Sequence, residues 1–159
     1  MGASSWHYIE SYGGDITVAL AKVRQREFER LFIHGTYWDG LQPAGQPFTS
    51  VNDLDDLWED ETLGSEGTHT IIDVWEVIVA EAYDDANTVR PLSDEESIAI
   101  FGTAEPARAD FERARERYAA RQPGSEELWE MPRWSAWCRP LNDGSGATTE
   151  VAFWGRSGG

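Results

Sequence analysis

The sequence predicts an α+β fold, in which one mostly antiparallel sheet of about four strands carries three to four helices on one face. Three observations predict it: an apolar run rich in Val and Ile near the middle of the chain, helical periodicity on both sides of that run, and two alternating segments near the C-terminal end. Strands and helices do not alternate strictly, as they would in a parallel doubly wound fold. A length of 159 residues fits a single domain over 1–159.

The N-terminal part is expected to hold a strand, a long helix and a short helix. Residues 4–12 alternate along the chain, which is typical of a strand. Asp15 is a good helix N-cap, and apolar residues recur at helical spacing over 15–33. Residues 34–47 are rich in Gly and Pro and predict a loop, after which a short acidic helix begins at Ser50.

Residues 67–80, GTHTIIDVWEVIVA, predict the central strand of the sheet, buried on both faces. Eight of the last ten residues are apolar, and Val and Ile dominate. Asp73 interrupts this run, and a buried carboxylate must be hydrogen-bonded, paired or neutral. An Arg partner from a neighbouring element is the favoured explanation; the alternatives are a pocket in which Asp73 is a general acid or base, or a less buried strand. His69 would share a face with Asp73, roughly 13 Å along the strand.

The C-terminal half is expected to contain two helices and end in a β-hairpin. Ser93 and Glu96 have the spacing of a capping box, and Gly102 suits the end of the helix that they begin. The turn-rich residues 142–147 predict the hairpin loop. In order, we expect an exposed polar loop over 81–90, helices over 93–101 and from Thr103 to about 122, strands over 133–141 and 148–154, and a flexible tail over 155–159.

The composition excludes several classes of function. The formal net charge is −16, from 29 acids and 13 bases, which opposes binding to nucleic acid or to an anionic membrane and favours a basic protein partner. No run approaches the 18 apolar residues of a membrane span, and the start lacks the features of a signal peptide. A single cysteine, Cys138, fits a reducing cytoplasm, and the preference for Arg over Lys favours a bacterial source with high GC content.

Acidic residues are concentrated in the middle of the chain. No Lys or Arg lies between Arg30 and Arg90, whereas thirteen Asp and Glu do. This crowding is compatible with a solvated helix face, with a docking surface for a basic protein, or with a divalent metal site, although the order of an EF-hand loop is absent. The residues that we expect to bind a partner are Asp53, Asp55, Asp56, Glu59, Asp60 and Glu61.

Other candidate side chains are aromatic rings and histidines. His34, Tyr37 and Trp38 could form the lip of a ligand site. Trp75 and Trp134 fall in expected strands and should build the core, although aromatic rings flanked by acids can also line a pocket for a cation or anchor a protein interface. The histidines lack the spacing of a metal site and Cys138 lacks a nearby base, so we expect no metal, no cofactor and no thiol nucleophile.

Two hypotheses about function follow from these patterns. The first is an acidic cytoplasmic interaction protein of the immunity, antitoxin or inhibitor type, which binds a basic protein partner. The alternative is a small enzyme or ligand-binding protein, with a pocket between sheet and helices built around Asp73, His69, Tyr37 and Trp38. The sequence leans against an enzyme, because no catalytic motif is evident and Asp73 and His69 are its only catalytic candidates.

Overall fold

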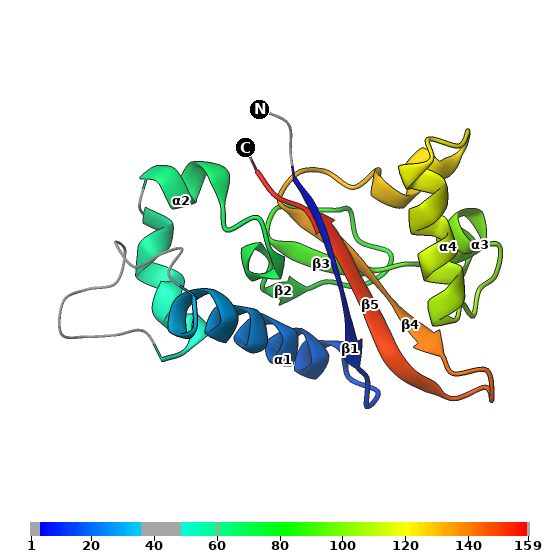
Figure 1. Cartoon of the computed structure of the whole chain (residues 1–159), viewed down its shortest axis with the longest axis horizontal. Helices are drawn as coiled ribbons and strands as arrows, with labels where there is room; N and C mark the ends of the chain where they lie inside the picture. Colours follow the sequence, from blue (N-terminus) through cyan, green and yellow to red (C-terminus); the bar gives the residue numbers. More distant parts are fainter. Residues whose placement is uncertain (1–3, 36–48, 60, 159) are drawn as a thin grey trace.

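The fold is a single five-stranded mixed sheet with helices packed against it, described by a computed structural model for residues 4–35, 49–59 and 61–158 (Figure 1). The side chains of residues 56, 57, 59 and 61–63 lie outside this description. The strand order is β1-β5-β4-β3-β2. The strands are β1 (Ser5–Ser11), β2 (Glu76–Val77), β3 (Thr88–Pro91), β4 (Ser135–Asn142) and β5 (Thr148–Arg156).

Two pairs of neighbouring strands in the sheet are antiparallel and two pairs are parallel. β5 pairs antiparallel with both β1 and β4, whereas β3 runs parallel to β4 and β2 runs parallel to β3. The α+β class, the single sheet and the C-terminal hairpin of β4 and β5 are therefore confirmed. The expected sheet of about four mostly antiparallel strands was only approximately right.

The helices begin and end close to the expected positions. They are α1 (Ile16–Phe28) with a π-helical extension η1 (Glu29–Ile33), the 3-10 helix η3 (Val51–Glu59), α2 (Glu61–Glu66), the 3-10 turn η4 (Ile71–Asp73), α3 (Asp94–Phe101), α4 (Arg108–Ala119) and the 3-10 helix η5 (Ser125–Trp129). The capping box of Ser93 and Glu96 is present at α3. α4 starts later than expected, because Asp110 accepts a hydrogen bond from the backbone N–H of Ala107 at its N-terminus. No helix among the described residues is long and apolar enough to cross a membrane.

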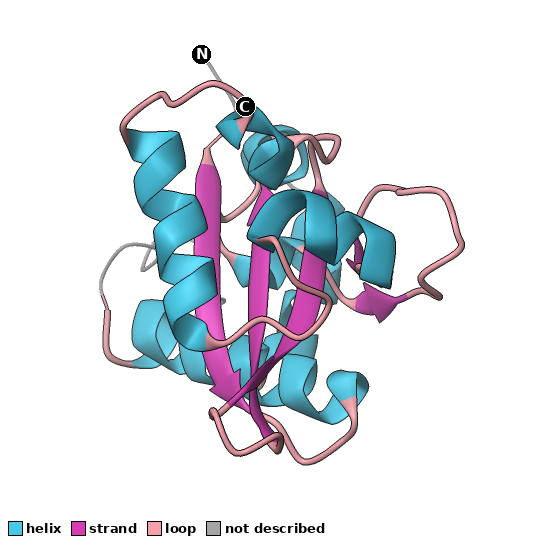
Figure 2. Cartoon of the chain, turned by 90° about the vertical axis from the view of Figure 1, so that its right-hand side faces the viewer, coloured by secondary structure: helices cyan, strands magenta, loops and turns pink. Residues whose placement is uncertain are grey.

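The helices cover both faces of the sheet, so the expectation of one covered face was wrong. Side chains alternate along β5: Val151 and Phe153 pack with α1, whereas Ala152 and Trp154 pack with α3 and α4. Both faces of β5 are apolar and both need cover. Figure 2, seen from the side of α3 and α4, shows helices both in front of the strands and behind them.

The segment 67–80 is not the central strand. It forms the turn η4 and then only the two-residue strand β2, at the edge of the sheet. Gly67 and His69 have positive φ angles, which interrupt an extended backbone, and the side chain of Thr70 caps the turn. The run is nevertheless buried over 70–74, where Ile71 and Val74 join the core beneath α1.

The last described residues of the chain, Ser157 and Gly158, lie inside the fold. β5 continues to Arg156, two residues beyond the expected end of the strand. Ser157 and Gly158, which were expected in the tail, are buried, and the backbone N–H of Ser157 donates to the carbonyl of Ser4 at 2.9 Å. The last described residues therefore contribute to the packing near the start of β1.

Candidate functional site

Asp73 is fully buried and is held by four donors from two distant parts of the chain. Its Oδ1 accepts from the backbone N–H and from the hydroxyl of Thr68, both at 2.7 Å. Its Oδ2 accepts from the backbone N–H of His69 at 3.2 Å and from the hydroxyl of Ser157 at 2.5 Å. Burial raises the pKa of Asp73, and the hydrogen bonds from Ser157 and Thr68 oppose that rise.

The expected Arg partner of Asp73 is replaced by these hydroxyl and backbone donors. Arg24 lies near enough for the charges of Asp55 and Asp73 to raise its pKa, against a larger lowering by burial. Its guanidinium donates instead to the carbonyl oxygen of Ile72 at 3.3 Å. Because Asp73 has no exposed surface, it joins the turn η4 to the C-terminus and does not face a ligand from solvent.

His69 is closer to Asp73 than a strand would allow, because the chain turns between them. Its backbone has φ 59°, and its backbone N–H, not its ring, donates to Asp73. The ring Nδ1 shares a 2.6 Å hydrogen bond with the hydroxyl of Ser4. The two catalytic candidates are therefore brought together by the backbone and have separate side-chain partners.

The other expected site residues are only partly described. His34 follows η1 and is exposed, while Tyr37 and Trp38 lie outside the described residues. Asp53 and Asp55 are exposed on η3. Asp53 accepts from the backbone N–H groups of Thr49 and Ser50, which lowers its pKa. Asp60 and the side chains of Asp56, Glu59 and Glu61 lie outside the described part of the chain.

No metal centre is formed within residues 4–35, 49–59 and 61–158, where no three His, Cys, Asp or Glu side chains lie together in a way that could hold an ion. Two hollows lie away from the acidic middle of the chain. One, of about 290 Å³, lies between α3, α4 and η5, and the other, of about 300 Å³, lies beside Tyr12 and Arg139. Neither hollow is lined by a residue that the sequence predicted for a site.

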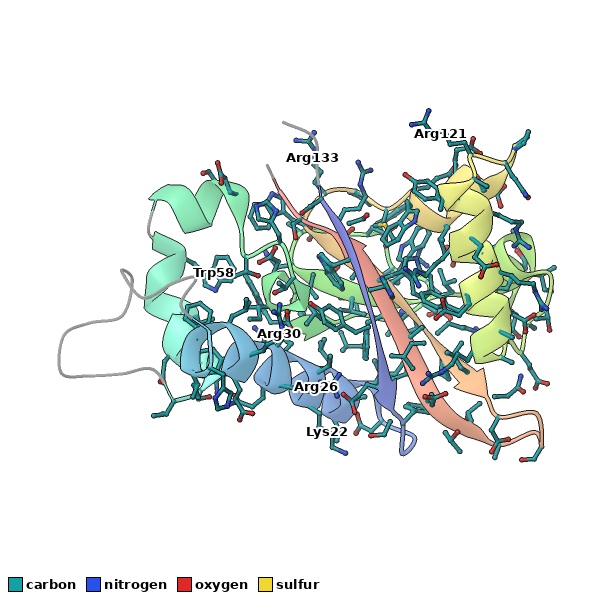
Figure 3. The ribbon with its side chains drawn as sticks, in the orientation of Figure 1. Lys22, Arg26, Arg30, Trp58, Arg121 and Arg133 are labelled. Atoms are coloured by element: carbon teal, nitrogen blue, oxygen red, sulfur yellow. The ribbon has the colours of Figure 1, made fainter. Side chains whose placement is uncertain are left out.

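A third hollow is lined by three tryptophans from three separate segments. Trp58 comes from η3, Trp75 precedes β2 and Trp134 precedes β4. Together with Gly64, Ala86 and Asn87, these residues line an open depression of about 310 Å³. The rings of Trp58 and Trp75 pack on each other, with their centres 5.6 Å apart and their planes at 44°. In Figure 3, Trp58 points from its helical segment toward the β2 edge of the sheet. We call this feature the tryptophan hollow.

The backbone around Trp134 fixes the position of its ring. Trp134 has a φ angle of 67°. Its backbone N–H donates to the backbone carbonyl of Arg156 at 2.7 Å, and its own carbonyl accepts from the backbone N–H of Asn87 at 2.5 Å. Its ring lies against Gly67 and Gly158, where any side chain would overlap it. The expectation that Trp134 belongs to a core strand was therefore wrong, since it sits in a strained turn against two glycines.

Residues 75–85 expose large apolar side chains next to acids, and we call them the 75–85 segment. Trp75, Val79 and Tyr83 are 45%, 67% and 97% exposed. They are three of the seven large hydrophobic side chains that are exposed in the described part of the chain. The exposed acids of the same segment are Glu76, Glu81 and Asp85. From the sequence, Trp75 was expected in a buried strand and residues 81–90 in an exposed polar loop. The exposed surface that Trp75 forms with the residues up to Asp85 was therefore not predicted.

The buried side chain of Arg90 binds the 75–85 segment through hydrogen bonds and an ion pair. Its buried guanidinium donates to the carbonyl of Ala80 at 3.1 Å and to Asp84 at 2.8 Å. It also binds both carboxylate oxygens of Glu96, at 2.7 and 2.8 Å. The guanidinium lies 5.5 Å from the centre of the Trp137 ring, whose Nε1 donates to Asp84 at 2.9 Å. The loop that carries Tyr83 is therefore held by hydrogen bonds at Ala80, before Tyr83, and at Asp84, after it.

Apart from the buried Arg90, three basic residues outside the 75–85 segment follow one another at helical spacing. Lys22 and Arg26 lie on α1, and Arg30 follows them on η1 (Figure 3). Arg26 pairs with Glu10, and Arg30 pairs with Glu27. The 75–85 segment contains no Lys or Arg, and neither does the described part of η3, where the charge of Asp55 acts on Arg24 of α1.

Comparison of the chain with protein-family models, with curated proteins and with solved structures gives no match.

Proposed function

We propose that the protein is an acidic interaction protein of the immunity, antitoxin or inhibitor type, which binds a basic protein partner. The observation that carries the proposal is the 75–85 segment, where Trp75, Val79 and Tyr83 are exposed between acids. Asp53 and Asp55 on η3 extend the acidic surface. The whole stretch from 31 to 89 contains no Lys or Arg that would repel a basic partner.

The physical argument combines three properties of the segment. Buried aromatic anchors supply most of the free energy of many interfaces, and Tyr83 and Trp75 are available for that role. Acids around them steer a basic partner to the surface and raise the association rate. The Arg90 network holds the loop in place before binding, which reduces the entropy lost on association.

We place this interaction in a bacterial cytoplasm as part of the same proposal. The single cysteine is buried and unpaired, as is common in a reducing compartment. The alternative function, a pocket built around Asp73, His69, Tyr37 and Trp38, draws no support from the described residues, because Asp73 is inaccessible.

The test is capture of the partner from the native host, followed by titration of the purified pair. We expect a basic protein that is retained at low salt and released at high salt. Tyr83→Ala should weaken the purified complex by tenfold or more, which corresponds to about 1.4 kcal/mol. Tyr118→Ala is the control, because Tyr118 is an exposed tyrosine on α4, outside the 75–85 segment, and the substitution should leave the affinity unchanged.

Two results would contradict the proposal. One is that no basic protein is captured at low salt. The other is a partner whose affinity is the same for the wild type, Tyr83→Ala and Tyr118→Ala, because the 75–85 segment would then lie outside the interface.

A further inference from the structure

We infer that the tryptophan hollow binds an arginine side chain of the partner. This inference rests on the proposed function, since it names the group that a basic partner inserts. The hollow opens beside the 75–85 segment, because Trp75 belongs to both. A partner that covers Trp75 and Tyr83 would also cover the mouth of the hollow.

The shape of the hollow suits a flat cation. The rings of Trp58 and Trp75 pack on each other, with their centres 5.6 Å apart and their planes at 44°, so they present adjoining indole surfaces to the hollow, and Trp134 adds a third ring. A guanidinium group is planar, weakly hydrated and stacks on aromatic faces. Cation–π attraction acts within about 6 Å of a ring centre, so a group that enters the hollow can be within range of more than one indole.

The charge around the hollow favours a cation over a neutral group. Glu76 follows Trp75 and Asp85 precedes Ala86, and both acids are exposed. Asp55 lies three residues before Trp58 on the 3-10 helix η3, where side chains three apart lie above one another. These three acids are therefore close in sequence to residues that line the hollow, and the charge of Asp55 also acts on Arg24, whose pKa it raises against a larger lowering by burial.

Among the described residues, those that line the hollow include no Lys or Arg. Residues 31–89 contain no Lys or Arg, and Arg133, which precedes Trp134, lies at the upper edge of Figure 3, apart from Trp58. Elsewhere the fold already uses the proposed contact, since the guanidinium of Arg90 lies 5.5 Å from the centre of the Trp137 ring.

The walls of the hollow are organised before binding. Gly67 and Gly158 hold the ring of Trp134, and the backbone N–H of Trp75 donates to Asn87 at 2.9 Å. The side-chain amide of Asn87 in turn donates to the carbonyl of Asp73 at 2.8 Å. The ring of Trp134 and the backbone of Trp75 are therefore held before a ligand enters, which reduces the entropy lost on binding.

The experiment uses the whole chain labelled with 5-fluorotryptophan and observed by fluorine NMR. The eight tryptophans give eight signals, and Trp58→Phe, Trp75→Phe and Trp134→Phe assign the three that matter. The probes are the N-acetyl, N-methylamide derivatives of arginine, lysine, citrulline and leucine. Citrulline has nearly the shape of arginine without its charge, so it separates a cation site from an apolar one.

We expect saturable shifts with the arginine probe, confined to the signals of Trp58, Trp75 and Trp134. Smaller shifts should occur with lysine and none with citrulline or leucine. Equal shifts with citrulline or leucine would overturn the inference in favour of an apolar site. Unsaturated shifts spread over all eight signals would overturn it in favour of a general effect of salt.

A second readout uses the purified partner from the capture experiment. Trp75→Ala should weaken binding by about 2- to 30-fold, the range expected for loss of a cation–π contact. Trp129→Ala is the control, since Trp129 packs on Tyr118 at the α4 side of the molecule. An affinity unchanged by Trp75→Ala would overturn the inference.

Failure of this inference differs from failure of the proposed function. If Tyr83→Ala weakens the complex while the arginine probe shifts no signal, the hollow is not a cation site and the interaction protein remains. If the arginine probe binds but no basic protein is captured, the proposed function fails and so does the assignment of the occupant to a partner.

Discussion

The hydroxyl of Ser157 lies 2.5 Å from Oδ2 of Asp73, and this contact joins residues that are 84 positions apart. The same hydroxyl oxygen accepts from Nε1 of Trp6 at 3.1 Å. Both ends of the described chain therefore meet at the turn η4. The carboxylate of Asp73 gains its fourth donor from this hydroxyl, and the indole of Trp6 gains an acceptor.

Ser157→Ala should destabilise the fold. The substitution removes one donor from the buried Asp73 and leaves the buried indole N–H of Trp6 without its acceptor. An unsatisfied buried polar group costs about 1–3 kcal/mol, and we expect a loss of unfolding free energy in that range. Urea unfolding followed by circular dichroism measures it.

Ser145→Ala is the control for this loss, because Ser145 is exposed in the turn of the β4–β5 hairpin. Its unfolding free energy should stay within about 0.5 kcal/mol of the wild type. Equal midpoints for Ser157→Ala and Ser145→Ala would show that the contact with Asp73 adds nothing to stability.

Glu96 should make the fold sensitive to acid. The bidentate contact with Arg90 lowers the pKa of Glu96 from 4.5 to about 2. A carboxyl whose pKa is lower in the folded state stabilises the fold above its unfolded pKa, and this stabilisation is lost as pH falls toward the folded pKa. Glu96→Gln should therefore remove part of the fall in melting temperature between pH 5 and pH 2, measured by thermal unfolding at several pH values.

Glu95→Gln provides the comparison, since Glu95 is exposed on the same turn of α3. Its melting temperature should follow the wild type across the acid range. If Glu96→Gln and the wild type lose stability with the same slope below pH 5, the pair with Arg90 does not contribute to the acid response. Glu96 also accepts from the backbone N–H of Ser93, so some loss of stability at neutral pH is expected for the variant.

The elements that the sequence predicts well are those with signals close together in the chain. Helix α3 is an example: its start is marked by the capping box of Ser93 and Glu96 and its end by Gly102, all within ten residues. The hairpin of β4 and β5 is indicated by alternation on both strands and by turn residues between them. Each signal needs no knowledge of the rest of the fold, which is why both elements are found where expected.

The prediction of a strand over 67–80 was wrong because an apolar run indicates that a segment is buried but does not indicate its backbone conformation. Ile71 and Ile72 are buried as expected, but in a turn, since Asp73 and Thr70 bind backbone groups that a strand would pair with its neighbours. The hydroxyl of Ser157, which is the fourth donor to Asp73, is 84 residues away in the sequence, and no pattern near either residue predicts this contact.

The residues of the tryptophan hollow were not predicted from the sequence. The sequence indicated an acidic surface and allowed aromatic rings beside acids, but assigned the acids of 53–61 to it and put Trp75 in the core. The tryptophan hollow is formed by residues 58, 75 and 134, whose approach depends on the turn at 67–73 and on the glycines beneath Trp134. Such an arrangement requires the tertiary structure.

Cys138 should be unreactive in the folded protein. It lies on β4 with no exposed surface, in the core beneath α1, and burial raises the pKa of its thiol. Because the thiolate is the reactive form, a disulfide reagent such as dithionitrobenzoate should modify it only when the chain unfolds. The rate in the absence of denaturant should stay low from pH 7 to pH 9, although a free thiol ionises near pH 8.5.

Two measurements separate protection by the fold from low reactivity of the residue itself. In urea, labelling of Cys138 should rise along the unfolding curve measured by circular dichroism. In the Cys138→Ala background, Ser145→Cys places a thiol in the exposed hairpin turn, where it should react without denaturant. Labelling of native Cys138 at the rate of that exposed thiol would mean that β4 opens without global unfolding, and the core between α1 and the sheet would be less stable than its packing indicates.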